Sequence, residues 1–290
     1  MRSPIGQPSE LPARRRPGAW LFGLLIALAT SCSTAAAPVA AGAPIEGAAC
    51  PRNDALGTSR ILEVDAASFP RVGLKSFPQT LPLQDKEVVL TFDDGPWPPT
   101  TRKVLQALAQ ECVHATFFLI GRSASEFPDL VKRIAAEGHT IGHHTWSHPS
   151  LKRIPPDEAA AQIERGIAAD EKALHGVASP TPSTPFFRFP GFESTPATLD
   201  LLQSHGILVF GADLWASDWQ ELTAQQELAL LIKRLKAAQK GIILLHDTKA
   251  RTAAMLPAFL RYLRENGYRV VQVVAADQQK SRAADMSRAP

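Results

Sequence analysis

Apolar positions in residues 84–275 follow two alternating patterns. Short continuous apolar runs indicate buried strands, whereas apolar residues three or four positions apart indicate helices with one buried face. Strands are expected at 88–92, 115–120, 140–141, 186–189, 207–210, 242–245 and 268–274. Helices are expected at 100–110, 128–137, 157–174, 196–204, 224–238 and 253–265. Strands and helices therefore alternate through most of this region.

This alternation is typical of parallel βαβ units. An open doubly wound sheet and an incomplete (β/α) barrel are both built from such units, and seven strands favour the barrel. In either architecture the loops after the carboxyl ends of the strands gather on one face. The pattern predicts an α/β fold with its chemistry on those loops.

Residues 1–31 have the form of an export signal, with a basic cluster, an apolar run too short for a comfortable membrane span, and then small residues. The sequence at 29–32 resembles the site at which lipoprotein precursors are cut before a cysteine that is lipidated, here Cys32. Ordinary cleavage near residues 35–37 is the alternative. Both interpretations predict an exported protein, either periplasmic or anchored to the membrane as a lipoprotein through Cys32.

Three other segments flank or precede the main domain. Residues 32–57 are rich in Ala, Pro and Gly and are expected to form a flexible linker. Residues 58–83 are a lead-in segment, in which 61–64 is a candidate short strand. The main domain is expected at 84–275, and the polar, Ala-rich residues 276–290 are expected to be a disordered tail.

Cys50 and Cys112 are the cysteines that remain if Cys32 is lost or lipidated. In an oxidising compartment the two could form a disulfide. The alternative is a buried free thiol at Cys112, which precedes an apolar run. The sequence leaves both interpretations open.

The composition suits a globular protein, with 45% apolar residues. The net charge of +3 is carried by residues 1–31, and the rest of the chain is balanced. A balanced chain lacks the positive surface that attracts nucleic acid. Nucleic acid is therefore not an expected partner.

Asp93 and Asp94 are adjacent carboxylates at the end of the first strand of the main domain, before a Gly-Pro turn. Neighbouring residues of a strand point in roughly opposite directions, so one carboxylate can bind a cation while the other accepts a proton. A turn that closes the strand is the alternative interpretation.

His144 and His148 lie four residues apart after the strand at 140–141. On a helical turn this spacing places both rings on one side, where they could share a metal ion with Asp94. His143 has no partner four residues later, so His144 is taken as the ligand. The pattern of the zincin metalloproteases needs Glu after the first His. Thr145 occupies that position, so the zincin interpretation is excluded.

Three further polar residues follow expected strands. His246 ends the most apolar strand and could donate a proton to a leaving group. Arg188 could hold a carboxylate through two nitrogens, and Asp218 adds another carboxylate beside Trp219. A surface position is the alternative for each of them when it is considered alone.

Together these segments resemble the polysaccharide deacetylases of carbohydrate esterase family 4, which carry the nodulation-protein-B homology domain. The resemblance covers about residues 84–275. It rests on Thr-Phe-Asp-Asp-Gly-Pro, His-Thr-Trp-Ser-His, Arg-Phe-Pro, Asp-Trp and Leu-Leu-His, which occur in the family's order. The family resemblance implies a distorted (β/α)7 barrel.

The resemblance also implies a role for each residue of this sequence that matches a motif of the family. Zn²⁺, or another divalent metal, would be held by Asp94, His144 and His148. Asp93 would be the general base and Arg188 its tether, and His246 would be the general acid, oriented by Asp218. The backbone N–H of Gly191 would stabilise the oxyanion.

The sequence departs from the family where Gly191 and Phe192 replace the more usual Tyr and Gly. This departure puts the substrate groove in question more than the chemistry, because Gly191 still supplies a backbone N–H. Trp219, Phe192 and Trp97 are candidate aromatic contacts for sugar rings.

The expected function is the metal-dependent hydrolysis of N-acetyl groups on β-1,4-linked N-acetylglucosamine polymers, such as peptidoglycan or chitin oligosaccharides. The expected partner is thus an acetylated polysaccharide. Alternatives are an O-deacetylase of xylan or another polysaccharide, an inactive carbohydrate-binding protein on the same fold, and a non-haem iron oxygenase, which also uses two His and one carboxylate.

Overall fold

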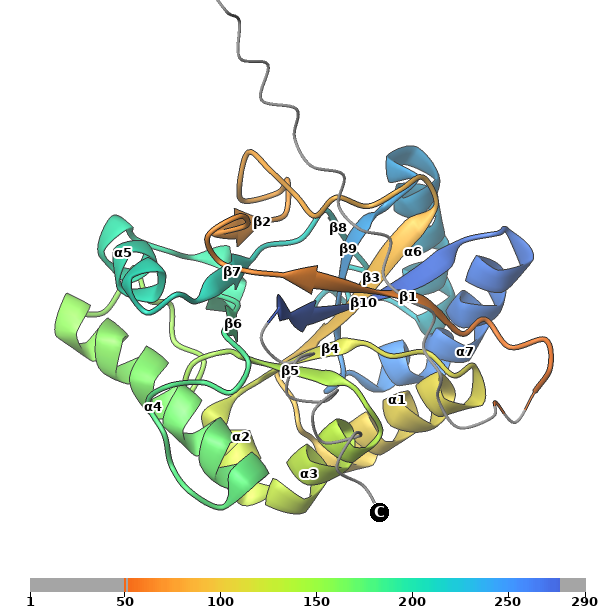
Figure 1. Ribbon diagram of the computed structural model, residues 1–290. Coiled ribbons are helices and arrows are strands. Elements are labelled where there is room, and N and C mark those ends of the chain that lie inside the picture. Colours follow the sequence, from red (N-terminus) through yellow and green to blue (C-terminus); the bar gives the residue numbers. More distant parts are fainter. Residues whose placement is uncertain (1–49, 51, 277–290) are drawn as a thin grey trace, which may run out of the picture. The chain divides into compact units, whose positions relative to one another are not determined.

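The computed structural model describes residues 50 and 52–276 (Figure 1). The expected export signal, Cys32, most of the expected linker and the tail beyond residue 276 lie outside the described residues. No helix in the described part is long and apolar enough to cross a membrane.

Seven parallel strands form the centre of the fold. They are β3 (Glu87–Asp93), β4 (Thr116–Leu119), β5 (Thr140–His143), β6 (Phe186–Phe187), β7 (Leu208–Phe210), β8 (Leu214–Trp215) and β9 (Gly241–His246). Neighbours in the row β8-β9-β3-β4-β5-β6-β7 pair in parallel. Among the described strands no pairing joins β7 to β8, so hydrogen bonds do not close the barrel there. The α/β fold is confirmed, and the strand order is that of a distorted, open (β/α)7 barrel.

The row includes β8, which the sequence pattern did not predict, and it does not include the expected strand at 268–274. β8 has two residues, too few for a periodic pattern to reveal. The expected strand is β10 (Arg269–Ala275), which pairs along its length with β1 (Thr58–Val64) but with only the first two residues of β3. Figure 1 shows β1 and β10 side by side.

The segment at 58–83 is part of the sheet. Besides β1, it contributes β2 (Arg71–Val72), which pairs with β7. Leu62 and Leu81 are buried in the same apolar cluster as residues of the barrel strands. This segment therefore belongs to the domain that the sequence pattern placed at 84–275.

The end of the expected linker is also attached to the domain. Cys50 forms a disulfide with Cys112, with a Cα–Cα distance of 5.9 Å. The backbone N–H of Leu56 donates to the Glu111 carboxylate at 2.9 Å. Because the disulfide joins positions 62 residues apart, loop-closure entropy predicts a stabilisation of about 4 kcal/mol.

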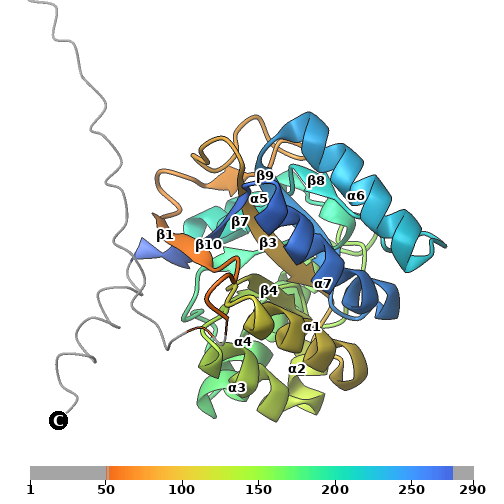
Figure 2. The ribbon, with the colours of Figure 1, turned by 90° about the vertical axis from the view of Figure 1, so that its right-hand side faces the viewer.

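Seven α-helices surround the described strands. They are α1 (Pro98–Gln110), α2 (Gly121–Glu126), α3 (Pro128–Ala136), α4 (Pro156–His175), α5 (Pro196–Ser204), α6 (Ala224–Ala238) and α7 (Ala250–Glu265). The sequence pattern predicted all except α2, which is too short for an apolar repeat. α5 and α6 begin at capping boxes, in which Thr195 and Thr223 accept backbone hydrogen bonds. Figure 2 shows α1, α7 and α6 side by side, and α7 contacts both of the others.

β3 is buried on both faces. Leu90 packs in the cluster that includes the apolar faces of α1 and α7, whereas Val89 packs in the cluster formed with β1 and β10. Because side chains alternate along a strand, Thr91 and Asp93 lie on the same side as Val89. The same alternation in β9 places His246 on the side of the second cluster. Asp93 and His246 thus lie at the carboxyl ends of two rows of side chains that face the barrel interior.

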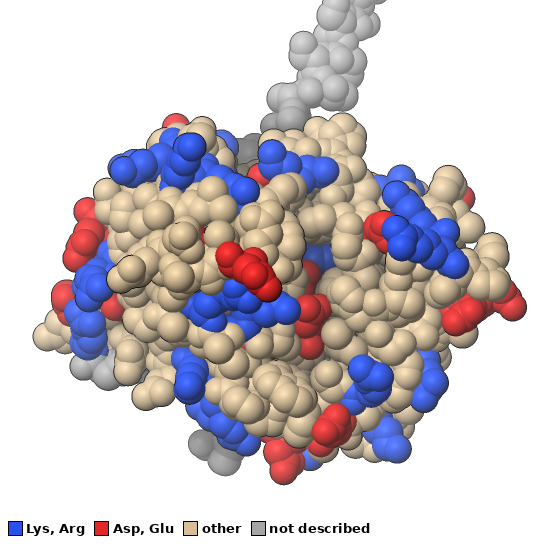
Figure 3. All heavy atoms as spheres, turned by 180° about the vertical axis from the view of Figure 1, so that it is seen from behind, with Lys and Arg blue, Asp and Glu red and all other residues tan. Residues whose placement is uncertain are grey.

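Charged side chains of both signs are interspersed over the face drawn in Figure 3. Lys and Arg gather in small groups that lie beside Asp and Glu, and uncharged atoms cover most of the face. This face therefore has no broad area of a single charge.

Candidate active site

A cavity of about 500 Å³ lies at the carboxyl ends of the barrel strands. Its walls contain both predicted carboxylates, both predicted metal-ligating histidines and the predicted acid: Asp93, Asp94, His144, His148 and His246. In the pairing of β3 with β9, Asp93 lies directly opposite His246. Parallel strands end at the same edge, which brings together residues that are far apart in the sequence.

Asp94, His144 and His148 direct potential ligand atoms at one another. Asp94 Oδ1 lies 3.3 Å from His148 Nε2 and 3.6 Å from His144 Nε2. One ligand atom from each of the three lies within 4.8 Å of the other two. Asp94 Oδ1 is buried and has no hydrogen-bond partner among the described residues, which is costly for a carboxylate unless a cation or proton meets it. Two imidazole nitrogens and one carboxylate oxygen suit zinc, so these residues fit a divalent metal.

The state of the His144 ring also fits metal binding. Burial lowers the pKa of His144 to about 3, so the imidazole is neutral at pH 7. Nδ1 lies 2.7 Å from the backbone oxygen of Arg188, and this contact requires that Nδ1 carry the proton. Nε2, on the side of Asp94, is then the unprotonated nitrogen that a metal requires.

The two histidines lie on a loop, so the expected helical turn is wrong. Thr145 and His148 have positive φ angles of 67° and 60°, and Thr145 Oγ1 accepts a hydrogen bond from the His148 N–H. The loop packs against α4 at Gly166, where a Cβ would lie 2.5 Å from the Thr145 carbonyl carbon. This close approach and the sharp turn bring the rings of His144 and His148 to a centroid distance of 4.9 Å.

Asp93 is held by Arg188, which follows β6 and is fully buried. Arg188 Nη1 donates to Asp93 Oδ1 and to Thr91 Oγ1, each at 2.7 Å, and Nη2 donates to the backbone oxygen of Gly211. The expected two-nitrogen contact is wrong, because the Gly211 carbonyl takes the second nitrogen. Burial raises the pKa of Asp93, and the charge of Arg188 opposes this effect. Thr91 was missed, although its position two residues before Asp93 on the same strand face could have indicated it.

His246 is paired with Asp218. Its Nδ1 lies 2.7 Å from Asp218 Oδ1, and its backbone N–H donates to Asp218 Oδ2 at 2.7 Å. Burial lowers the pKa of His246, but the hydrogen bond and charge of Asp218, with smaller contributions from Asp94 and Asp93, raise it to about 9. A cation bound at Asp94 would offset part of this increase. The ring is thus a candidate proton donor at neutral pH.

Asp247 supports the turn that carries Asp94. Its side chain is fully buried, accepts a hydrogen bond from Thr101 and lies against Gly95, where any Cβ would overlap the Asp247 carboxylate. Burial raises the pKa of Asp247 to about 7. The sequence pattern placed Asp247 beside His246 but gave it no role.

Comparison with known proteins identifies the family. Residues 80–210 match a family model described as polysaccharide deacetylase. A peptidoglycan-N-acetylglucosamine deacetylase of Bacillus cereus is 31% identical over 212 residues, which are 70% of this chain and 76% of that protein. The chain belongs to the polysaccharide deacetylase family.

Two other family members show how much of the chain is shared. Another Bacillus cereus protein of the same name is 40% identical over 143 residues, 49% of this chain and 50% of that protein. The solved structure of the peptidoglycan deacetylase Bd3279 of Bdellovibrio bacteriovorus has a TM-score of 0.67 and 32% identity, and covers 81% of this chain and 64% of that one. The chain spans half the length, or less, of several curated relatives that it matches.

Aromatic residues form one wall of the cavity in this deacetylase-family chain. The Trp215 ring lies 6.4 Å from that of Phe192 and 5.9 Å from that of Trp219. All three line the cavity, and Trp219 is 48% exposed. Trp97 is similarly exposed, at 46%, but it packs edge-on against Phe127 and is not part of the cavity wall. The structure therefore brings two of the three predicted aromatic contacts to the site.

Gly191 and Lys249 also line the cavity. Gly191 lies in a short 3₁₀ turn (Pro190–Phe192) with a positive φ of 58°, and Glu193 Cγ, at 3.7 Å, is the nearest atom to the place of a Cβ. Lys249 precedes α7 and adds a positive charge to the wall. The sequence pattern gave no signal for Lys249.

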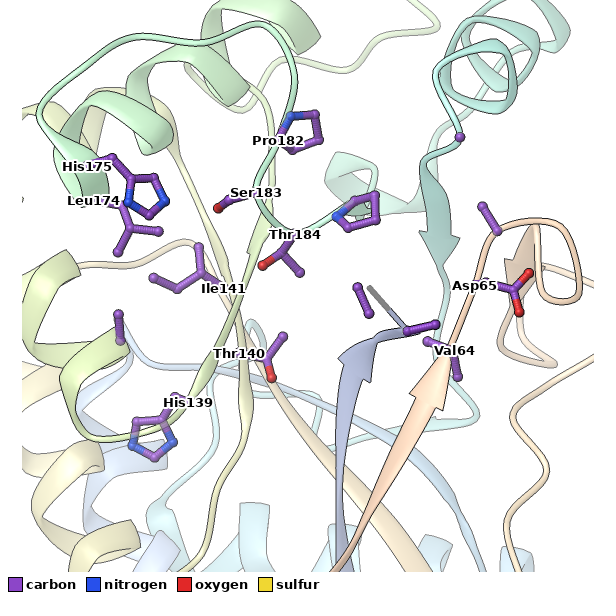
Figure 4. Close-up of a pocket in the computed structure, with 16 residues that line it drawn as sticks. Val64, Asp65, His139, Thr140, Ile141, Leu174, His175, Pro182, Ser183 and Thr184 are labelled. Carbon is purple, nitrogen blue, oxygen red and sulfur yellow. The ribbon is translucent and has the colours of Figure 1, made fainter. Parts of the chain in front are cut away.

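A second cavity, of about 590 Å³, lies near the amino ends of β5 and β6 (Figure 4). Figure 4 shows His139, Thr140 and Thr184 around it, with Val64 and Asp65 at the end of β1. The group of potential metal ligands found in the described residues is in the other cavity. The larger cavity is thus separate from the candidate active site.

Proposed function

We propose that this protein is a metal-dependent deacetylase that hydrolyses N-acetyl groups of β-1,4-linked N-acetylglucosamine polymers of the peptidoglycan or chitin type. The observation that carries the proposal is the meeting, in one cavity, of a metal-ligand set, a buried carboxylate and a histidine paired with a second carboxylate. The names of the related proteins support peptidoglycan as the first polymer to test.

Asp94, His144 and His148 are the residues that would hold the metal, which we propose to be Zn²⁺ or another divalent ion. A divalent cation there would polarise the acetyl carbonyl and make a water molecule more acidic. The orphaned Asp94 oxygen and the neutral His144 ring support this assignment.

Asp93 is the proposed general base. Hydrolysis of an amide requires that the attacking water lose a proton, and a base of raised pKa accepts it more readily. Burial supplies that rise, while Arg188 keeps the carboxylate in one position. Asp93 Oδ2 lies 3.9 Å from His144 Nε2, beside the proposed ligands.

His246 is the proposed general acid, because the departing amine must receive a proton. Asp218 keeps the ring protonated and fixes its orientation through Nδ1, so Nε2 is left to donate. The backbone N–H of Gly191 is the proposed donor to the oxyanion that develops on the acetyl oxygen.

Phe192 and Trp219 are the proposed contacts for the sugar rings. Aromatic faces pack against the apolar faces of sugars, and both residues line the cavity. Trp215 supports them by its contact with each ring.

Peptidoglycan lies outside the cytoplasm, so we also propose that the protein is exported. Lipidation of Cys32 stays a prediction. Labelling of cells with an alkyne fatty acid tests it, because a C32S variant would lose the label if the prediction is right.

The function is tested by acetate release from peptidoglycan, chitin oligomers and acetylxylan with zinc-loaded protein. Release from the N-acetylglucosamine polymers is expected. Release from acetylxylan alone would identify an O-deacetylase instead. Sugar binding without acetate release from any substrate, with zinc bound, would identify a carbohydrate-binding protein.

Asp93→Asn tests the base. Acetate release should fall by about 10²–10⁴-fold, because the amide cannot accept the proton, while bound zinc measured by elemental analysis is unchanged. Asp85→Asn is the matched control, since Asp85 is exposed just before β3 and its loss should leave turnover unchanged. Undiminished turnover in Asp93→Asn would contradict the base assignment.

A further inference from the structure

A chain of polar side chains continues from His246 into the interior between α6 and α7. Thr252 Oγ1 lies 2.9 Å from Asp218 Oδ2 and 3.0 Å from Glu227 Oε1. Asp218, Thr252 and Glu227 are fully buried. α6 carries Glu227 and α7 carries Thr252, and these helices lie side by side (Figure 2). These hydrogen-bonded side chains are therefore shielded from solvent where they reach Asp218.

The number of protons available to these two hydrogen bonds indicates which acid is protonated. An ionised carboxylate only accepts hydrogen bonds, and the Thr252 hydroxyl has one proton for two carboxyl groups. If both acids were ionised, one of the two contacts would join a lone pair of the Thr252 hydroxyl to a buried carboxylate oxygen with no proton between them. A proton on Glu227 Oε1 satisfies both contacts, because Glu227 then donates to Thr252 and Thr252 donates to Asp218.

The surroundings of Glu227 favour this arrangement. Burial and the charge of Asp218 raise the pKa of Glu227 to about 7, although Thr252, Arg251 and His246 oppose the rise. The position of Glu227 in the first turn of α6 also opposes it. Glu227 Oε2 is buried without a hydrogen-bond partner in the described part of the chain. An unpaired oxygen is tolerated more readily in a neutral acid than in a carboxylate.

We propose that Glu227 is a positioning residue that carries a proton and, through the Thr252 hydroxyl, directs a hydrogen bond to Asp218 that holds this carboxylate against His246. The link to catalysis rests on the proposed function, in which His246 is the general acid. Glu227 itself does not contact the cavity. Its ionisation places a second negative charge beside Asp218 and makes the two acids compete for the Thr252 proton.

The protonation of Glu227 is tested by NMR on the full chain, zinc-loaded and labelled with ¹³C at the glutamate side-chain carboxyl. One signal should titrate near pH 7 and disappear in Glu227→Gln, whose amide still donates to Thr252. Glu221→Gln is the matched control, because Glu221 is exposed just before α6 and its loss should leave that signal in place. A Glu227 signal that titrates near the ordinary value of 4.5 would overturn the proposal.

The ring of His246 gives a second readout. Its ¹⁵N shifts should show a small step near pH 7 when Glu227 ionises, and Glu227→Gln should remove the step. Asp247 adjoins His246 and has a raised pKa of about 7, so Asp247 is the other source of such a step. A step that persists in Glu227→Gln would contradict the link to Glu227.

The positioning role is tested at Thr252. Thr252→Val removes the hydroxyl and should lower kcat about 10–100-fold with little change in KM, because the charged Asp218 carboxylate loses one hydrogen-bond donor. Thr252→Ser should restore kcat, and thermal unfolding shows whether both variants fold. An unchanged kcat in folded Thr252→Val would overturn the role. If the wild type released no acetate, the proposed function would fail, while the NMR titrations would still decide the state of Glu227.

Discussion

The two ends of the barrel carry cavities of similar volume but different chemistry. The cavity at the carboxyl ends, of about 500 Å³, gathers two adjacent carboxylates and three histidines from β3, β5 and β9 or the loops after them. The cavity at the amino ends, of about 590 Å³, contains His139 and hydroxyl groups but not the metal-ligand group found in the described residues. Volume alone would favour the amino-end cavity, whereas the converging ionisable groups favour the carboxyl-end cavity as the candidate active site.

The largest expected difference between the two ends comes from removing a ligand at the carboxyl end. His148→Ala should abolish detectable acetate release and reduce bound zinc measured by elemental analysis, because two ligands remain. His175→Ala, at the amino-end cavity, is the matched control and should leave both measurements unchanged. Equal losses of zinc in the two variants would show that the metal is not selective for the carboxyl end.

The next largest effect is expected at Arg188, whose buried guanidinium donates to Asp93 at the carboxyl end of the barrel. Arg188→Lys keeps a positive charge but cannot contact Asp93, Thr91 and Gly211 together, so kcat should fall about 10–100-fold. Chemical denaturation should also show a lower free energy of unfolding, since the Gly211 carbonyl loses its donor. Arg71→Lys is the control, because Arg71 Nη2 donates an exposed hydrogen bond to Gln203 Oε1 at 3.1 Å. Wild-type kcat in Arg188→Lys would contradict the positioning of Asp93 by this guanidinium.

A smaller effect is expected at the aromatic wall. Trp219→Ala should raise KM for a chitin or peptidoglycan substrate about 2–10-fold, with a smaller effect on kcat, because a stacking surface is lost. Trp97→Ala is a close control, since Trp97 is almost equally exposed but lies outside the cavity wall. If the Trp97 variant raised KM as much, the substrate groove would extend beyond the cavity described above.

The smallest effect on activity is expected when His139 at the amino end is replaced. That substitution should instead change how the stability of the fold depends on pH. Burial lowers the pKa of His139 to about 3, whereas it is near 6.5 when exposed in the unfolded chain. The unfolded state therefore binds the proton first as the pH falls below 6.5, and the folded state loses roughly 3 kcal/mol of relative stability by pH 4.5.

His139→Gln should remove this part of the pH dependence. The Gln oxygen can still accept the hydrogen bond that the Ala115 N–H donates to His139 Nδ1. Unfolding followed by fluorescence between pH 7 and 4.5 measures the change, and acetate release at pH 7 should be unaffected. An equally steep fall of stability in the variant would contradict the assignment to His139.

The sequence was most informative where a local period or a strand end carried the signal. The apolar repeats located six helices and the main strands, and α6 begins and ends where they placed it. Asp93, Asp94 and His246 could be placed at one edge because parallel strands end together. Short elements such as β8 and α2 escaped, since a period cannot be recognised in so few residues.

The sequence by itself determined that an α/β chain carries two carboxylates and three histidines at strand ends, together with a family resemblance that the comparisons confirm. The tertiary structure decided which atoms meet. Arg188 reaches Asp93 across 95 positions, and Glu227 reaches the Asp218 carboxylate only through Thr252 of another helix. Periodicity is encoded locally, whereas these contacts depend on how helices and strands pack, which no local pattern specifies.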